Sequence, residues 1–157
     1  MIVTDILHSP LGDIVLTADG DMLCGLTFAE RTRPLAAQQT GETPLIVSET
    51  RRWLSCFFAG RAPDFTPKLV PADTPFQNAL REALLSIPYG ETVTYAALAK
   101  TLHSSPRAVG HAIGRNPILL IVPCHRVIGK NGALTGYAGG LPRKAELLRL
   151  EQSARMK

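Results

Sequence analysis

A proline-containing segment, residues 63 to 75, divides this sequence into two halves with different patterns. Before it, short β-prone runs within residues 2–28 alternate with turn-forming residues, which is typical of an antiparallel meander. Apolar residues at roughly helical spacing between 46 and 58 then predict one helix. After the segment, helix-capping signals predominate. We therefore expect an α+β chain with a small antiparallel-sheet domain over residues 1–73 and a mostly helical, winged helix-turn-helix-like domain over residues 74–157.

Capping residues predict three helices in the second half, over residues 74–87, 95–102 and 106–115. The first begins at Thr74-Pro75, with Thr as the N-cap and Pro at the first helical position. Thr94 is the expected cap of the second helix, and Ser104 or Ser105 that of the third. Two short helices joined by a tight turn are a helix-turn-helix candidate. The same apolar residues could also simply pack as the core of a small helical domain.

Charge is distributed unevenly along the chain. Residues 1–76 contain six Lys and Arg against nine Asp and Glu, a net charge of −3, whereas residues 77–157 contain eleven against four, a net charge of +7. A polyanion should therefore meet the second half. From charge alone, nucleic-acid binding and an ordinary soluble surface both stay open.

The predicted helix at residues 106–115 has an unusual composition for a core helix. Several of its residues are small, among them Ala108 and Gly110, which lowers helix propensity but lets a phosphate backbone approach closely. Arg107 and Arg115 flank that surface. This composition favours a nucleic-acid contact.

The chain has three cysteines, Cys24, Cys56 and Cys124, and no CxxC pair. This predicts neither a disulfide framework nor a zinc site and fits a reducing compartment. No apolar run is long enough to span a membrane, and the first ten residues lack the positive charge of a signal peptide. We expect a cytoplasmic protein that does not contact a membrane.

One segment carries reactive side chains. The apolar run Ile118–Val122 is typical of buried, β-prone sequence, and it delivers Cys124 to a turn beside His125 and Arg126. Positive neighbours favour the thiolate, which is the nucleophilic form of cysteine. On a regular strand adjacent side chains point to opposite faces, so His125 could reach the sulfur only across a bend or through a water. A Cys-His dipeptide alone also fits a buried structural cysteine.

Five motifs of the second half resemble the O6-alkylguanine-DNA alkyltransferase family in order and spacing. The resemblance covers nearly all of residues 74–151. The motifs are Ile87-Pro88-Tyr89-Gly90-Glu91-Thr92, Arg107-Ala108-Val109-Gly110, Arg115-Asn116-Pro117, Val122-Pro123-Cys124-His125-Arg126-Val127-Ile128-Gly129 and Gly136-Tyr137-Ala138-Gly139-Gly140.

The resemblance implies roles for five residues in a reaction centre. Cys124 is the implied alkyl acceptor, and His125, acting through a water, the implied base. Glu151 is placed like the glutamate that orients the histidine, although a solvated charge near the end of the sequence is the alternative. Asn116 resembles a hinge asparagine that ties the paired helices to the cysteine segment. Tyr95 resembles a tyrosine that helps to rotate the nucleotide and contacts the guanine.

The resemblance also implies a DNA interface and a base pocket. Arg107 would enter the base stack in place of the flipped nucleotide, and the helix that follows it would lie in the minor groove. Lys144 would assist proton handling, with a solvated helix lysine as the alternative. The DNA-binding set is Tyr95, Arg107, Ala108, Gly110, Arg115 and Arg126. The pocket set is Val127, Tyr137, Ala138, Gly139 and Lys144.

These expectations add up to a DNA-repair protein that transfers a methyl or alkyl group irreversibly to Cys124. The expected donor is O6-alkylguanine, with O4-alkylthymine as a second candidate. One monomer would repair one lesion in double-stranded DNA, without a metal or an organic cofactor. Two alternatives stay open. A sensor would bind alkylated DNA without reacting, but such relatives have replaced the acceptor cysteine. A Cys-His hydrolase would need an oxyanion hole, for which the sequence offers no feature.

Overall fold

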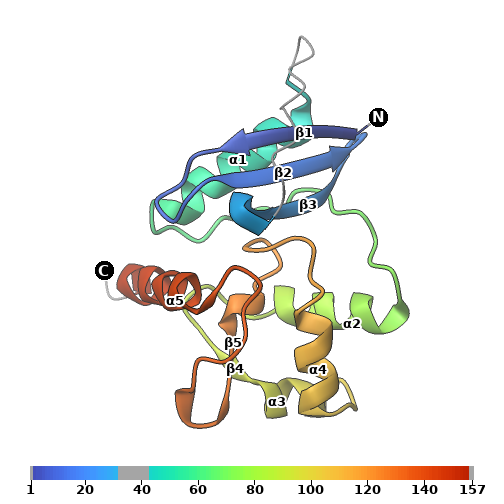
Figure 1. The fold of residues 1–157 in the computed structure, drawn as a ribbon, viewed down its shortest axis with the longest axis vertical. Helices are drawn as coiled ribbons and strands as arrows, with labels where there is room; N and C mark the ends of the chain where they lie inside the picture. The colour runs from blue at the N-terminus through green and yellow to red at the C-terminus, as the bar shows by residue number, and fades with distance from the viewer. Residues whose placement is uncertain (1, 32–42, 156–157) are drawn as a thin grey trace. The chain divides into compact units, whose positions relative to one another are not determined.

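The computed structural model describes residues 2–31 and 43–155. The chain separates into two compact units, Met1–Val70 and Pro71–Lys157, whereas the sequence suggested a boundary between residues 73 and 74. Figure 1 shows a sheet and a helix in the first unit and mainly helices in the second. The α+β class is confirmed.

The first unit is an antiparallel sheet packed on one long helix. Strands β1 (Ile2–Leu7), β2 (Ile14–Asp19) and β3 (Met22–Phe28) pair in the order β1-β2-β3. A short 3-10 turn, η1 (Ala29–Arg31), follows β3. Helix α1 (Leu45–Phe58) lies along the sheet (Figure 1). The helix buries four of the five apolar side chains that predicted it, Ile46, Trp53, Leu54 and Phe57, and Phe58 is half-buried. Burying them stabilises the unit by roughly 1.5–3 kcal/mol per large side chain.

The second unit contains the paired helices. Helix α2 (Pro75–Leu85) is followed by the short strand β4 (Val93–Thr94) and by helices α3 (Tyr95–Thr101) and α4 (Pro106–Ile113). Strand β5 (Val127–Ile128) pairs in parallel with β4, and α5 (Leu141–Arg155) completes the unit. Two 3-10 segments, η2 (Cys124–Arg126) and η3 (Lys130–Gly132), flank β5.

Three predicted helix starts of this unit are confirmed by their hydrogen bonds. The side chain of Thr74 accepts from the backbone N–H of Gln77 at 3.1 Å, and that of Thr94 accepts from Ala97 at 3.0 Å. Ser105, rather than Ser104, caps α4. Each such cap satisfies one of the N–H groups that a helix leaves without an internal partner.

Candidate active site around Cys124

A tight succession of turns places Cys124, and the β-prone interpretation of the preceding run is wrong. Residues 118–122 are buried but form mainly turns instead of a strand. The N–H of Ile121 donates to the carbonyl of Leu119 at 2.8 Å, which closes a γ-turn around Leu120 at φ 69°. A second γ-turn around Pro123 is closed by the N–H of Cys124, which donates to Val122 at 2.8 Å. The cysteine therefore begins a 3-10 segment in the unit's interior.

Asn116 connects the end of the paired helices to this turn. Its side-chain amide donates to the carbonyl of Val122 at 3.1 Å and to the Cys124 sulfur at 3.3 Å, and its Oδ1 accepts from the N–H of Ile118 at 3.1 Å. Asn116 therefore contacts both the backbone before the cysteine and the thiol itself.

The thiol of Cys124 is almost inaccessible, with 1% of the residue exposed. Burial raises the pKa of Cys124 to about 11, although the Asn116 hydrogen bond and the charge of Lys144 act in the opposite direction. At neutral pH the sulfur is therefore protonated. A reaction that uses its thiolate needs a base that removes the proton.

His125 and Glu151 form a buried pair beside that thiol. The Nε2 atom of His125 lies 2.5 Å from the Glu151 Oε2 atom, and both side chains are buried. The sequence left Glu151 open as a solvated charge, but Glu151 is only 1% exposed. Since Nε2 faces Glu151, Nδ1 is the ring nitrogen that could act as a base.

Burial also sets the protonation of this pair. Burial lowers the pKa of His125, and the nearby charges of Arg126 and Lys144 lower it further against the opposing effect of Glu151. Burial alone would raise the pKa of Glu151, but its contacts with His125 and Arg126 outweigh that effect and lower it. A neutral imidazole beside a carboxylate is the resting state that follows, and such an imidazole can accept a proton.

Arg126 belongs to the predicted DNA-binding set, but its side chain is buried. It is 7% exposed, and its Nε donates to Glu151 Oε1 at 2.8 Å while its Nη1 donates to the carbonyl of Ile87 at 2.7 Å. The position of Arg126 in the sequence does not reveal that its guanidinium is buried. The structure corrects this assignment.

Tyr95 and Lys144 converge on the loop that precedes α5. Their Oη and Nζ atoms both donate to the carbonyl of Thr135, at 3.0 and 2.8 Å, and Nζ lies 5.7 Å from the centre of the Tyr95 ring. Lys144 is fully buried, so it is not the solvated lysine that was the alternative. The pairing of β4 with β5 brings Tyr95, which directly follows β4, close to η2, which directly precedes β5.

The remaining predicted pocket residues lie on β5 and on the same loop. Val127 and Gly139 are buried, and Ala138 is half-buried. The Tyr137 ring packs edge-on against His125, with 6.4 Å between ring centres. Burial raises the pKa of Tyr137 well above its ordinary value, so its hydroxyl stays protonated. The hydroxyl oxygen is buried without a hydrogen-bond partner among the described residues, which makes it an available donor.

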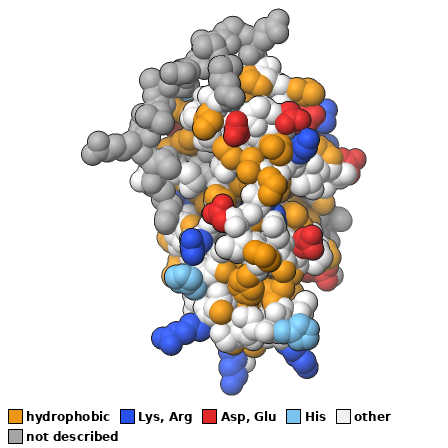
Figure 2. Space-filling model, turned by 90° about the vertical axis from the view of Figure 1, so that its right-hand side faces the viewer, with side chains coloured by type: hydrophobic (Ala, Val, Ile, Leu, Met, Phe, Trp, Pro, Cys, Tyr) orange, Lys and Arg blue, Asp and Glu red, His pale blue; other side chains and the backbone are white. Residues whose placement is uncertain are grey.

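The exposed face of α4 carries both small residues and an arginine. Arg107 on α4 and Arg115 in the turn after α4 are exposed as expected. Ala108 is exposed, and a Cβ atom added to Gly110 would lie 3.9 Å from the Tyr95 ring. Sequence reasoning missed His111, which is also exposed and lies at i+4 from Arg107. The four-residue spacing of Arg107 and His111 on the predicted helix was the available signal. Figure 2 shows Lys, Arg and His side chains gathered at the end of this unit where α3 and α4 lie.

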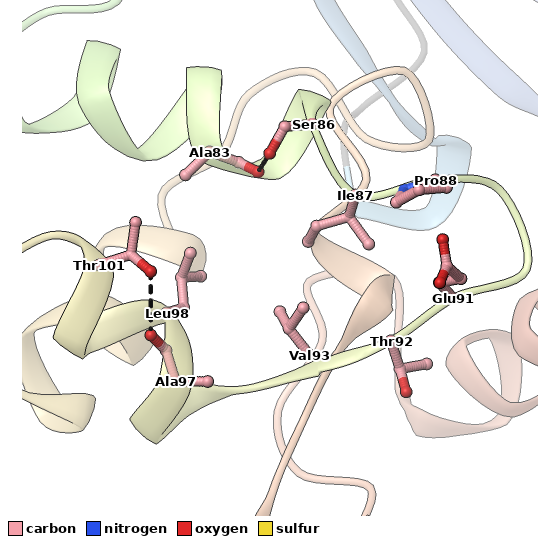
Figure 3. Close-up of a pocket in the computed structure, with 10 residues that line it drawn as sticks. All are labelled: Ala83, Ser86, Ile87, Pro88, Glu91, Thr92, Val93, Ala97, Leu98 and Thr101. Carbon is pink, nitrogen blue, oxygen red and sulfur yellow. Dashed lines mark hydrogen bonds between the residues drawn. The ribbon is translucent and has the colours of Figure 1, made fainter.

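A separate cavity of about 230 Å³ lies between α2, β4 and α3 (Figure 3). Ile87, Val93 and Leu98 line it, and the hydroxyls of Ser86 and Thr101 at its rim donate to carbonyls of their own helices. None of its lining residues belongs to the predicted reaction centre. Within residues 2–31 and 43–155, no group of three or more His, Cys, Asp or Glu side chains could hold a metal ion, and no helix is long and apolar enough to cross a membrane.

The second unit combines a winged pair of helices that has a cationic outer face with a buried cysteine beside a His-Glu pair. These features define a class of DNA-binding proteins with a reactive thiol. Residues 75–153 match the family model described as 6-O-methylguanine DNA methyltransferase, DNA binding domain. The chain belongs to this family.

Relatives with this function in their names match almost the whole chain. The methylated-DNA–protein-cysteine methyltransferase of Methanosarcina acetivorans is 45% identical over 151 residues, which cover 94% of this chain and 97% of the relative. The protein of the same name from Mycobacterium tuberculosis is 42% identical over 149 residues, covering 94% of this chain and 90% of the relative.

Solved structures agree with this assignment. The crystal structure of the Mycobacterium tuberculosis O6-methylguanine methyltransferase has a TM-score of 0.84 at 41% identity and covers 98% of this chain and 94% of its own. Mycobacterium tuberculosis OGT in complex with DNA has a TM-score of 0.81 at 40% identity, covering 95% and 92%.

Proposed function

We propose that this protein repairs DNA by transferring a methyl or alkyl group from O6-alkylguanine to Cys124, in a single irreversible turnover. The observation that carries the proposal is the buried thiol of Cys124 beside the His125-Glu151 pair, within a chain of the methyltransferase family. The retained cysteine distinguishes it from a sensor that binds alkylated DNA without reacting. O4-alkylthymine is a second candidate lesion.

The contacts around Cys124 support a stepwise account of proton and group transfer. The thiol proton passes through a bridging water to Nδ1 of His125, whose Nε2 proton stays directed at Glu151. The sulfur then forms a bond to the alkyl carbon as the bond from that carbon to O6 of guanine breaks. The guanine leaves as its anion or takes a proton from Tyr95, whose pKa burial raises. The thioether product has no hydrolytic or disulfide-exchange route back to the thiol.

The direct test uses a duplex that contains one O6-methylguanine. After incubation at equal concentrations, the peptide that contains Cys124 should gain the mass of one methyl group per protein molecule, and the lesion should become guanine. An unmodified peptide with tight binding to the damaged duplex would indicate a sensor. Repeated turnover of an ester or amide substrate would indicate a hydrolase.

The exposed face of α4 supports binding of double-stranded DNA through the minor groove, where its small residues let the helix approach the backbone. Arg107 is the proposed wedge that replaces the flipped base, and Tyr137, Ala138 and Lys144 belong to the proposed pocket. We expect the protein to act as a monomer, without a cofactor, in the cytoplasm.

Replacing Arg115 with alanine should weaken binding to duplexes of any sequence, because this exposed cation in the turn after α4 would contact phosphate. The slope of log affinity against log salt should become shallower by about one. Fluorescence anisotropy over a salt series measures both. Arg61, an exposed residue of the first unit, gives the matched Arg61→Ala control, which should keep the wild-type slope. An unchanged slope for Arg115→Ala would contradict this interface.

A further inference from the structure

Arg126 is a buried cation to which the proposed reaction gives no role. Its three nitrogens are all engaged: Nε and Nη2 donate to the two oxygens of Glu151 at 2.8 and 3.2 Å, and Nη1 donates to Ile87 at 2.7 Å. The guanidinium also lies over the ring of Tyr89, 5.5 Å from its centre. Such a bidentate contact fixes the plane of a carboxylate, whereas the ammonium group of a lysine does not.

The carboxylate of Glu151 has a further donor in the turn before β4. Its Oε1 atom accepts from the buried N–H of Gly90 at 3.0 Å in addition to Arg126. Gly90 adopts φ 86°, a conformation that favours glycine, and its carbonyl accepts from the side chain of Gln152 at 2.8 Å. This turn is therefore hydrogen-bonded to two consecutive residues of α5. The carboxylate is held so that Oε2 points at His125.

We infer that Arg126 is a positioning residue for the transfer reaction. Its Nε and Nη2 groups hold the carboxylate of Glu151, so that His125 keeps its proton on Nε2 and presents Nδ1 to the proton of Cys124. This inference rests on the proposed function. Arg126 has a second effect, because its positive charge balances the buried carboxylate. An unbalanced carboxylate 2.5 Å from the ring would favour the imidazolium, which cannot accept another proton.

The other groups around His125 do not replace Arg126 in this role. Lys144 is directed at the carbonyls of Thr135 and Gly136, and Tyr137 meets the imidazole edge-on. Arg126, by contrast, donates to both oxygens of Glu151. Among the described residues, the charged and titratable groups that face His125 are Glu151 and Lys144 from α5, Arg126 from η2 and Tyr137 from the loop. Cys124 precedes His125 in the chain.

Two substitutions separate the geometric effect from the charge effect. Arg126→Lys keeps the charge but cannot contact both oxygens of Glu151. The single-turnover rate of methyl transfer at saturating DNA should therefore fall about tenfold, while the shape of its pH profile stays the same.

Arg126→Gln removes the charge as well, and His125 should then take up a proton more readily. The acidic limb of the rate profile, below which the base is protonated, should move up by about one pH unit. A residue that only supports the fold would change the amount of folded protein and leave the limb where it is.

A DNA-independent readout keeps this test distinct from that of the proposed function. Long-range ¹H–¹⁵N spectra of the free protein should show wild-type His125 neutral with its proton on Nε2, and Arg126→Lys with a mixture of tautomers. Arg149→Gln is the matched control, because Arg149 is an exposed arginine of α5 and should leave rate, profile and tautomer unchanged. Wild-type tautomer and rate profile in both Arg126 variants would overturn the inference. A wild-type protein that never methylates Cys124 would overturn the proposed function instead, whatever the spectra show.

Discussion

Cys124→Ser should lose methyl transfer while it keeps its affinity for DNA that contains O6-methylguanine. A serine hydroxyl is a far weaker acid than a thiol, and the buried site already raises the pKa of the thiol to about 11. The hydroxyl is therefore too weak an acid for the His125-Glu151 pair to deprotonate. Removing a nucleophile from an enzyme reduces its rate on the order of a million-fold, so transfer should become undetectable. Mass spectrometry of the protein and anisotropy with the damaged duplex measure the two properties.

The other two cysteines supply the matched controls. Cys24 and Cys56 are free and lie in the first unit, so Cys24→Ser and Cys56→Ser should each still accept one methyl group per molecule. Methylation of Cys124→Ser at either of these thiols, at the wild-type rate, would contradict the assignment of Cys124. Loss of DNA affinity in Cys124→Ser would instead point to a change in the fold.

Glu151→Gln should lower the free energy of unfolding by about 3–5 kcal/mol, because it leaves the guanidinium of Arg126 buried without its counter-charge. The new amide group would also place a donor among the donors of His125 and Gly90. Urea unfolding monitored by circular dichroism should show a lower midpoint and an unchanged slope. Glu146 provides the contrast, since it is on the same helix but pairs with Arg149 at the surface. Glu146→Gln should leave the midpoint nearly unchanged.

The same variant should lose part of the acid sensitivity of the fold. The pKa of Glu151 is lowered in the folded protein, so its carboxylate stabilises the fold above the ordinary pKa near 4.3, and this stabilisation is lost as the pH falls through the folded value. His125 has the same sign: its imidazole takes up a proton near pH 6.5 when unfolded but stays neutral in the fold. Wild-type stability should therefore decline below about pH 6.5 and again below about pH 4.3. An equal second decline in Glu151→Gln would contradict the buried contact.

Local signals in the sequence were sufficient for most of the fold. Thr74, Thr94 and Ser105 mark helix starts because a cap is made by residues three positions apart. The run before Cys124 misled because apolar, β-prone composition indicates burial more reliably than it indicates a strand. Leu120 at φ 69° adopts a backbone conformation that leucine disfavours, and only the surrounding packing imposes it.

The candidate site depends on contacts that no local pattern contains. Gly90 donates to Glu151 across 61 residues of sequence, and Arg126 reaches Ile87 across 39. Family resemblance named Cys124 and Glu151. Arg126 was placed in the DNA-binding set, and nothing in the sequence indicated that its guanidinium is buried. His111 could have been found from its spacing to Arg107.

The burial of Cys124 also determines how long a protein molecule that has not yet reacted stays able to accept an alkyl group. Oxidation by peroxide proceeds through an exposed thiolate, whereas this sulfur is 1% exposed and its pKa is raised to about 11. A protein whose single reactive atom is consumed by one event has no spare capacity for accidental loss. A sulfur that is buried and protonated in the free protein therefore preserves each copy in the presence of oxidants and reactive small molecules.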